Sequence, residues 1–178
     1  MPWPLDAIRN GDDYVEWGHM KEAQDEAFDY CLQRGAHSDA CACHPTPKGD
    51  WIDFATLEPG LPSNHYLLCA PAICEVSGNL DETLRFSHSA GKVAAELVRL
   101  QPNAEQRILP NGDIQLRYVA VTPVARFRDD VDVLVRPSGP EAAEVAIYSR
   151  SRIGLSDLGK NKSRVDALMK QLEADLAR

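Results

Sequence analysis

The sequence predicts an α+β fold: a small antiparallel sheet of about four to five strands covered by two helices, with an extra acidic helix at the N-terminus. Two observations predict this fold. Apolar residues recur at helical spacing in three segments, and they alternate with polar residues in several short segments after residue 84. Turn-forming residues join these short segments, which is typical of hairpins and therefore of antiparallel strands.

The length and composition are those of one ordinary domain. The chain has 178 residues, of which 44% are hydrophobic and 26% are charged, enough for a single core with a solvated surface. We expect one compact domain overall. Residues 1–62 would form the acidic helix and a proline-rich loop, and residues 63–178 would form the α+β core.

The N-terminal helix is predicted over residues 12–34. Asp12 or Asp13 suits its N-cap, apolar residues recur at helical spacing along it, and Gly35 suits its C-cap. Prolines and glycines punctuate residues 36–65, so we expect an irregular connection there.

The core is predicted to contain strands and helices in turn. Short apolar or alternating patterns predict strands at residues 84–87, 107–109, 114–122, 131–135 and 145–149. Helical spacing predicts helices over residues 89–100 and about 161–177. The dipeptide Asn111-Gly112 is the strongest hairpin-turn signal in the chain.

The charge of the chain argues against some classes of partner. The net charge is −8, from 19 basic and 27 acidic residues, and an acidic protein is repelled by nucleic-acid phosphates and by anionic membranes. Acidic residues concentrate in residues 1–30 and basic residues in residues 148–178, so we expect the two ends to attract each other within the fold. A protein partner for the acidic helix is the alternative, and no nucleic-acid partner is expected.

Targeting and membrane signals are weak. No segment approaches the ~20 apolar residues of a membrane-spanning helix, so no span is expected. The N-terminus lacks the basic start and apolar segment of a secretory signal. We expect a cytoplasmic protein if Met1 is the native start, and a plastid or periplasmic protein if a targeting segment has been removed.

The densest polar segment, residues 148–161, has two interpretations. Arg150 and Arg152 are two residues apart on a predicted strand, so they point to the same side. In the first interpretation they form ion pairs with the acidic residues that open the preceding strand. The structural pairing candidates are Asp129, Asp130 and Asp157.

The second interpretation is an anion site. Free backbone N–H groups at the start of the last predicted helix would help to hold a carboxylate or phosphate there. The candidate anion-binding or ligand-binding residues are Arg150, Arg152, Lys160, Asn161 and His65.

The same segment resembles a known family. Residues 149–154, with 156–159 and then Asn161, Lys162 and Arg164, resemble the C-terminal signature of the family catalogued as domain of unknown function 1499. Residues 129–131 are similar to the aspartate-rich strand of that family, and residues 64–69 with Cys74 are similar to an upstream pattern in one of its branches. The resemblance covers roughly residues 60–175.

The resemblance implies a fold but no reaction, because the family has no established one. Its members are often exported, membrane-tethered or plastid proteins. The first 50 or so residues depart from the family pattern, so a function that resides there would not be inherited.

The cysteines suggest no cofactor. The chain has five, and the histidines nearby make a metal site conceivable with the weak candidates Cys31, His37, Cys41, Cys43 and His44. The Cys-x-Cys spacing does not fit the usual zinc pairs, so no metal is favoured. Cys69 and Cys74 are a disulfide candidate in an oxidising compartment, but the favoured interpretation is free, buried thiols in a reducing one.

Three functions stay open. The leading hypothesis is a non-catalytic accessory module that binds a small ligand or a protein. The first alternative is a small-molecule enzyme with an anion-binding arginine cluster between sheet and helices, helped by His65 or His88. The second is a metal-binding protein that uses the Cys/His loop. The fold alone does not decide whether the chain is an enzyme, so the pairing of Arg150 and Arg152 becomes the discriminating observation.

Overall fold

A computed structural model describes residues 47, 49–57, 64–74, 79–80, 84–122, 126–153 and 156–178. The chain divides into two compact units, Met1–Thr46 and Pro47–Arg178. Within the second unit, part of the segment that precedes the sheet packs on it. Phe54 is buried, and the Gln115 side chain donates a hydrogen bond of 2.9 Å to the carbonyl of Ile52. The predicted acidic helix at 12–34 lies outside the described residues.

The described part of the Pro47–Arg178 unit forms one seven-stranded sheet. Its strands are β1 (His65–Cys69), β2 (Asn79–Leu80), β3 (Arg85–Phe86), β4 (Glu105–Ile108), β5 (Ile114–Val121), β6 (Arg128–Gly139) and β7 (Ala142–Ser151). The strand order is β2-β1-β7-β6-β5-β4, and β3 also pairs with β7. All pairs are antiparallel except β1 with β2.

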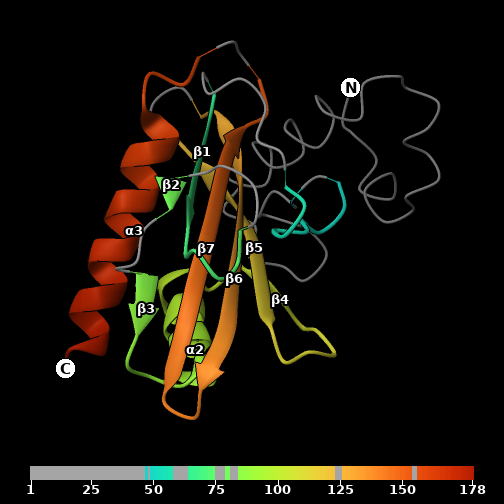
Figure 1. The fold of residues 1–178 in the computed structure, drawn as a ribbon. Helices are drawn as coiled ribbons and strands as arrows, with labels where there is room; N and C mark the ends of the chain where they lie inside the picture. Colours follow the sequence, from blue (N-terminus) through green and yellow to red (C-terminus); the bar gives the residue numbers. More distant parts are fainter. Residues whose placement is uncertain are drawn as a thin grey trace, which may run out of the picture. The chain divides into compact units, whose positions relative to one another are not determined.

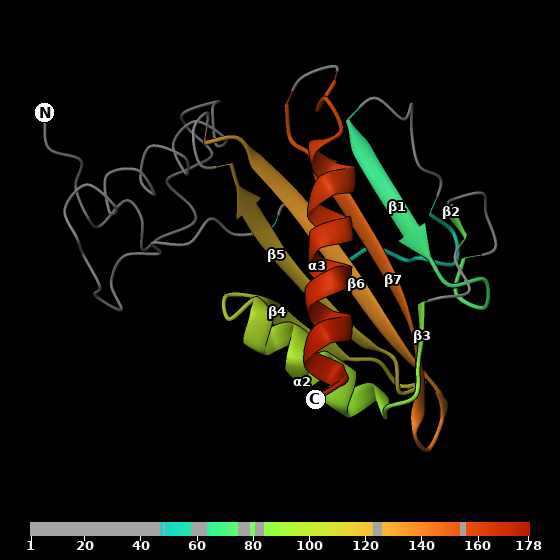
Figure 2. The ribbon, with the colours of Figure 1, turned by 90° about the vertical axis from the view of Figure 1, so that its left-hand side faces the viewer.

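Two helices, α2 (Ala90–Leu100) and α3 (Lys160–Leu176), cover the same face of this sheet. Figure 2 shows α3 running along β6 and β7, with α2 crossing near the C-terminal end of α3, and Figure 1 shows the sheet from its edge. Every second residue of the central strands points into this helix-facing core, because side chains alternate along a strand. The fully buried side chains there include Leu116, Val131, Val133, Val145, Ile147, Val93, Leu97 and Leu172.

The predicted α+β class is therefore confirmed, although the sheet is larger than expected. Both core helices begin within one residue of the prediction, and the Ser89 side chain caps α2 by accepting a hydrogen bond from the backbone of Lys92. Strands β6 and β7 extend beyond the predicted ranges, because polar residues at their ends continue the backbone ladder.

Strand β1 was not predicted, and it begins at His65, the last residue of the expected irregular connection. It carries the apolar run Leu67–Cys69, which is buried on both faces and so shows no alternation.

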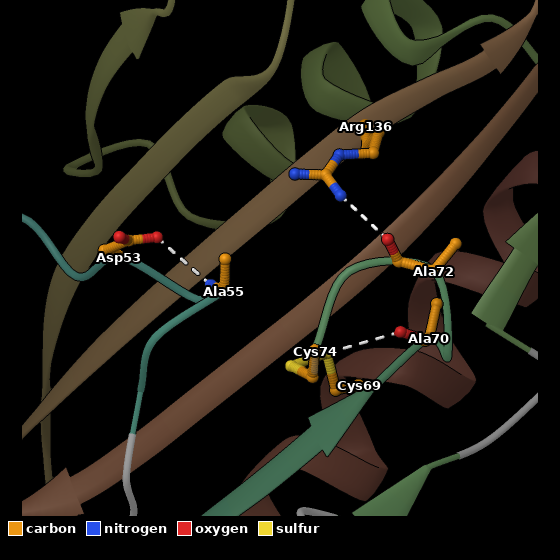
Figure 3. Close-up of a disulfide and its surroundings, with 7 residues drawn as sticks. All are labelled: Asp53, Ala55, Cys69, Ala70, Ala72, Cys74 and Arg136. Carbon is orange, nitrogen blue, oxygen red and sulfur yellow. Dashed lines mark hydrogen bonds between the residues drawn. A yellow bond between two sulfur atoms is a disulfide. The ribbon is translucent and has the colours of Figure 1, made fainter. Parts of the chain in front are cut away.

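The face of the sheet away from the helices is partly covered by two short segments. In residues 49–57, the ring of Trp51 lies 4.5 Å from the guanidinium carbons of both Arg107 and Arg117. In the loop after β1, the carbonyl of Ala72 accepts a hydrogen bond of 2.8 Å from Arg136 on β6 (Figure 3). The arginine side chains therefore use their charge and their planar faces to anchor both segments.

The loop after β1 is closed by a disulfide between Cys69 and Cys74 (Figure 3). The backbone N–H groups of Ile73 and Cys74 both donate to the carbonyl of Ala70, which turns the chain and brings the two cysteine Cα atoms within 6.2 Å. The favoured sequence interpretation of free, buried thiols is thus wrong for this pair. The sequence could not choose between the two states because the tight turn that joins them was not predicted.

Candidate functional site

Residues 149–152, the part of the family signature at the end of β7, place their side chains alternately on the two faces of the sheet. Ser149 and Ser151 point toward the helices, whereas Arg150 and Arg152 point to the opposite face. The same alternation applies to β6, where Asp129 points toward the helices and its neighbour Asp130 away from them. The register aligns Asp130 with Arg150 and Asp129 with Ser151, so like-facing residues meet across the two strands.

On the helix-facing side, Asn161 lies at the centre of a hydrogen-bond network. Its side chain, in the first turn of α3, is fully buried. Its amide nitrogen donates to the carbonyl of Asn64 (2.9 Å) and to Ser151 Oγ (3.1 Å). Its amide oxygen accepts from Ser149 Oγ (2.6 Å) and Arg164 Nη1 (2.8 Å). The amide uses its full hydrogen-bonding capacity to join α3 to β7 and β1, so its role is structural.

The start of α3 is fixed by two further carboxylates. Asp129 forms an ion pair with Arg164, whose guanidinium also donates to Ser149 Oγ (2.9 Å). Asp157 accepts hydrogen bonds from the backbone of Gly159 (2.9 Å) and Asn161 (2.7 Å). Partial burial raises the pKa of Asp157, but these backbone hydrogen bonds outweigh it and lower the pKa below its usual range. Both predicted pairing residues therefore act as anchors of the helix.

On the opposite face, Arg152 is paired with Asp130. Arg152 Nη2 donates to Asp130 Oδ1 at 2.7 Å, and Arg152 Nε lies 3.1 Å from Oδ2. Both side chains are only 5% exposed, so this is a buried ion pair. One of the two signature arginines is thus held by one of the predicted aspartates, as the structural interpretation requires.

Asp132, one step further along the same face of β6, is a buried carboxyl group that the sequence did not single out. It is 4% exposed. The register places it between Arg117 on β5 and Tyr148 on β7. Burial raises its pKa to about 6, and the nearby charge of Asp130 adds to this rise, while Arg150 and Arg117 oppose it.

Arg117 does not neutralise Asp132 directly, because its guanidinium is held elsewhere. Arg117 Nε donates to Glu105 Oε2 (2.8 Å), and Nη1 donates to the carbonyl of Gly49 (3.0 Å). The same guanidinium stacks on Trp51. Asp132 therefore receives only the longer-range field of this arginine.

Tyr148, the register partner of Asp132, lies near two basic side chains. Its ring centroid lies 5.6 Å from that of His65 and 5.8 Å from the guanidinium carbon of Arg150. His65 and Arg150 are partners in register on β1 and β7. Burial raises the pKa of Tyr148, so the phenol keeps its proton and stays a hydrogen-bond donor at neutral pH. We call Asp132, Tyr148, Arg150 and His65 the Asp132 cluster.

The predicted anion-binding residues are thus separated. Arg150 and His65 lie in the Asp132 cluster, and Arg152 is next to it but paired with Asp130. Asn161 is on the other face of the sheet, and Lys160 is an exposed residue at the first position of α3. Sequence reasoning missed Asp132 and Tyr148. The one available signal was a single acid within the otherwise apolar run Val131–Val135.

Metal ligands are not grouped in the part of the chain that the structure describes. No three His, Cys, Asp or Glu side chains among those residues are arranged to hold an ion. The weak metal candidates Cys31, His37, Cys41, Cys43 and His44 all lie outside that part. Among the described helices, neither combines the length and the apolar composition that crossing a membrane requires.

Comparison with known proteins gives a family but no activity. A family model described as "Protein of unknown function (DUF1499)" matches residues 75–172, which is more than half of the chain. The match includes α2, the strands from β2 to β7 and most of α3. No curated protein matches the sequence. The chain belongs to the DUF1499 family of proteins of unknown function.

Proposed function

We propose that this chain is a non-catalytic module that binds a small ligand or a protein partner through the face of the sheet away from the helices. The observation that supports it is the use of the signature residues. The side chains of Asn161, Arg164 and Arg152 all form hydrogen bonds or ion pairs with other groups of the protein. An arrangement of this kind holds a rigid sheet in place, and the family signature therefore supports a scaffold rather than a catalytic centre.

A second candidate function is an enzyme that acts on small molecules. It is favoured by Asp132, because a buried carboxyl group with a pKa of about 6 is suited to exchanging protons near neutral pH. Tyr148 and His65 would be the neighbouring acid–base groups. The binding function is the primary proposal, because most of the signature residues are engaged in structural contacts.

A protein partner for the acidic segment at residues 12–34 stays a prediction from charge alone. Its residues lie outside the described part of the chain, and the binding proposal for the sheet face does not depend on it.

Native mass spectrometry of the full chain tests the proposed function. A retained organic ligand or a co-purifying protein in the spectrum supports a binding module. If a retained small molecule is converted to a product on incubation with the protein, the chain is an enzyme and the non-catalytic proposal is wrong. Substitution of Asp132 by asparagine then shows whether the conversion depends on that carboxyl group.

A further inference from the structure

Strand β4 (Glu105–Ile108) forms one edge of the sheet. Among the described strands it pairs with β5 alone, and all four of its residues are exposed. Figure 1 shows it at the side of the sheet opposite to β2. An edge strand carries backbone groups that can pair with a further strand, and proteins usually protect such an edge with charged side chains or a cover. The interaction that this edge permits therefore depends on its backbone and on its side chains.

The hydrogen bonds of the β4–β5 hairpin identify the backbone groups that face outward. The Leu109 N–H donates to the Asp113 carbonyl at 2.8 Å, so Leu109 directs its backbone groups toward β5. Inward-facing and outward-facing residues alternate along an antiparallel strand, so Arg107 and Glu105 are also bonded to β5. The backbone groups of Gln106 and Ile108 therefore point away from β5, toward the open edge.

The apolar side chain at this edge is the opposite of a protective feature. Ile108 is 69% exposed, although burying a side chain of this size is worth about 1.5–3 kcal/mol. Side chains alternate along a strand, so Ile108 and Gln106 lie on one face and Arg107 and Glu105 on the other. A further strand at this edge would cover part of the exposed Ile108 side chain.

The two charged side chains of β4 are held in place but not fully used. Arg107 stacks on Trp51 at 4.5 Å, and its Nε donates to Gln115 at 2.8 Å. Glu105 Oε2 accepts a hydrogen bond of 2.8 Å from Arg117. The Arg107 Nη atoms and Glu105 Oε1 have no partner among the described residues. Two opposite charges are thus positioned on the same face of the edge, two residues apart.

We propose that β4 is a dimerisation strand, which pairs antiparallel with β4 of a second copy of this chain so that one sheet runs through both copies. In a two-fold symmetric pair, the residue at the axis lies opposite its own copy. With Gln106 at the axis, its outward backbone groups bond to those of the other copy. Each Glu105 then lies opposite the partner's Arg107, and the favourable charge pair forms twice.

The order of the charges selects both the register and the occupant. With Arg107 at the axis instead, two arginines would lie directly opposite each other, which is destabilising. An extended segment of another protein would need its own charges in the matching order, whereas β4 matches itself. The inference goes beyond the proposed binding function and does not depend on its ligand. A strand of four residues gives a small contact, so the dimer should be weak and concentration-dependent.

Sedimentation equilibrium of the full chain, from about 10 μM to about 1 mM at low salt, tests the dimer. The average mass should rise with concentration from that of one chain toward that of two. Glu105→Arg and Arg107→Glu should each dimerise about tenfold more weakly, because both charge pairs become repulsive. An equimolar mixture of these two variants should recover the dimer, since it restores opposite charges at both pairs.

Two further variants separate the strand from its charges. Gln106→Pro removes an N–H group that faces outward, so it should weaken the dimer and leave the β4–β5 pairing in place. Lys170→Glu, which makes the same change of charge as Arg107→Glu at an exposed position of α3, is the matched control and should dimerise as the unmodified chain does. Far-ultraviolet circular dichroism verifies that each variant is folded.

The outcomes decide the inference without deciding the proposed function. A dimer that weakens in both charge variants and recovers in their mixture supports it. A chain that stays monomeric up to about 1 mM overturns it, as does a dimer that none of the β4 variants weakens. A different protein that co-purifies with the chain and is lost in Gln106→Pro would also overturn the second copy as occupant. Ligand retention in the native mass spectrum is read separately from all of these results.

Discussion

Replacing Asp132 by asparagine should stabilise the protein at high pH and leave its stability nearly unchanged at low pH. Burial raises the pKa of Asp132 from 3.8 to about 6. A raised pKa means that the folded state favours the protonated acid, so its contribution is complete below 3.8 and is lost as the pH rises through about 6. A shift of about two units corresponds to about 3 kcal/mol. Asparagine resembles the protonated acid and avoids this loss.

Thermal and urea unfolding followed by circular dichroism would measure the effect for both proteins at about pH 4 and about pH 8. At about 2–4 °C per kcal/mol for a chain of this size, the variant should melt up to about 6–12 °C higher at the higher pH. Asp166→Asn is the matched control, because Asp166 is exposed and forms a surface ion pair with Lys162. An equal difference between Asp132→Asn and the unmodified chain at both pH values would refute the reasoning, since a pH-independent effect cannot come from ionisation of this group.

Three further predictions concern stability. Asp130→Ala should cost about 3–5 kcal/mol in urea unfolding, because it leaves Arg152 as a buried, unpaired charge, while the double variant Asp130→Leu with Arg152→Met should recover most of that loss. Asn161→Ala should cost about 3 kcal/mol or more, because it removes four hydrogen bonds that join α3 to β7 and β1; an unchanged melting curve would contradict this. Dithiothreitol should destabilise the protein by about 2 kcal/mol by opening the short Cys69–Cys74 loop, and a variant with both cysteines replaced by alanine should show no such response at that loop.

The parts of the fold that the sequence predicted are those with strong local signals. Apolar residues at helical spacing define α2 and α3, and Asn111-Gly112 correctly marks the turn between β4 and β5, with Gly112 at a φ of +87°. Strand β1 could not be recognised locally. It is inserted next to β7, far along the chain, and its burial on both faces removes the alternation that identifies a strand.

The candidate site was predictable only in part, for a similar reason. Sequence spacing correctly places Arg150 and Arg152 on one face, and it suggested that Asp130 would pair with a signature arginine. It could not reveal Asp132, because what distinguishes that residue is its burial, which depends on the packing of segments distant in the sequence. Its neighbour in register, Arg117, is likewise directed to Glu105 and to the distant Gly49.

The alternating Ser-Arg-Ser-Arg order of residues 149–152 places the two serines on one face of the sheet and the two arginines on the other. The two serines face α3 and, through Asn161, hold it on the sheet. Arg152 neutralises Asp130 on the opposite face. Most of the signature is therefore used to build the sheet and attach the helix.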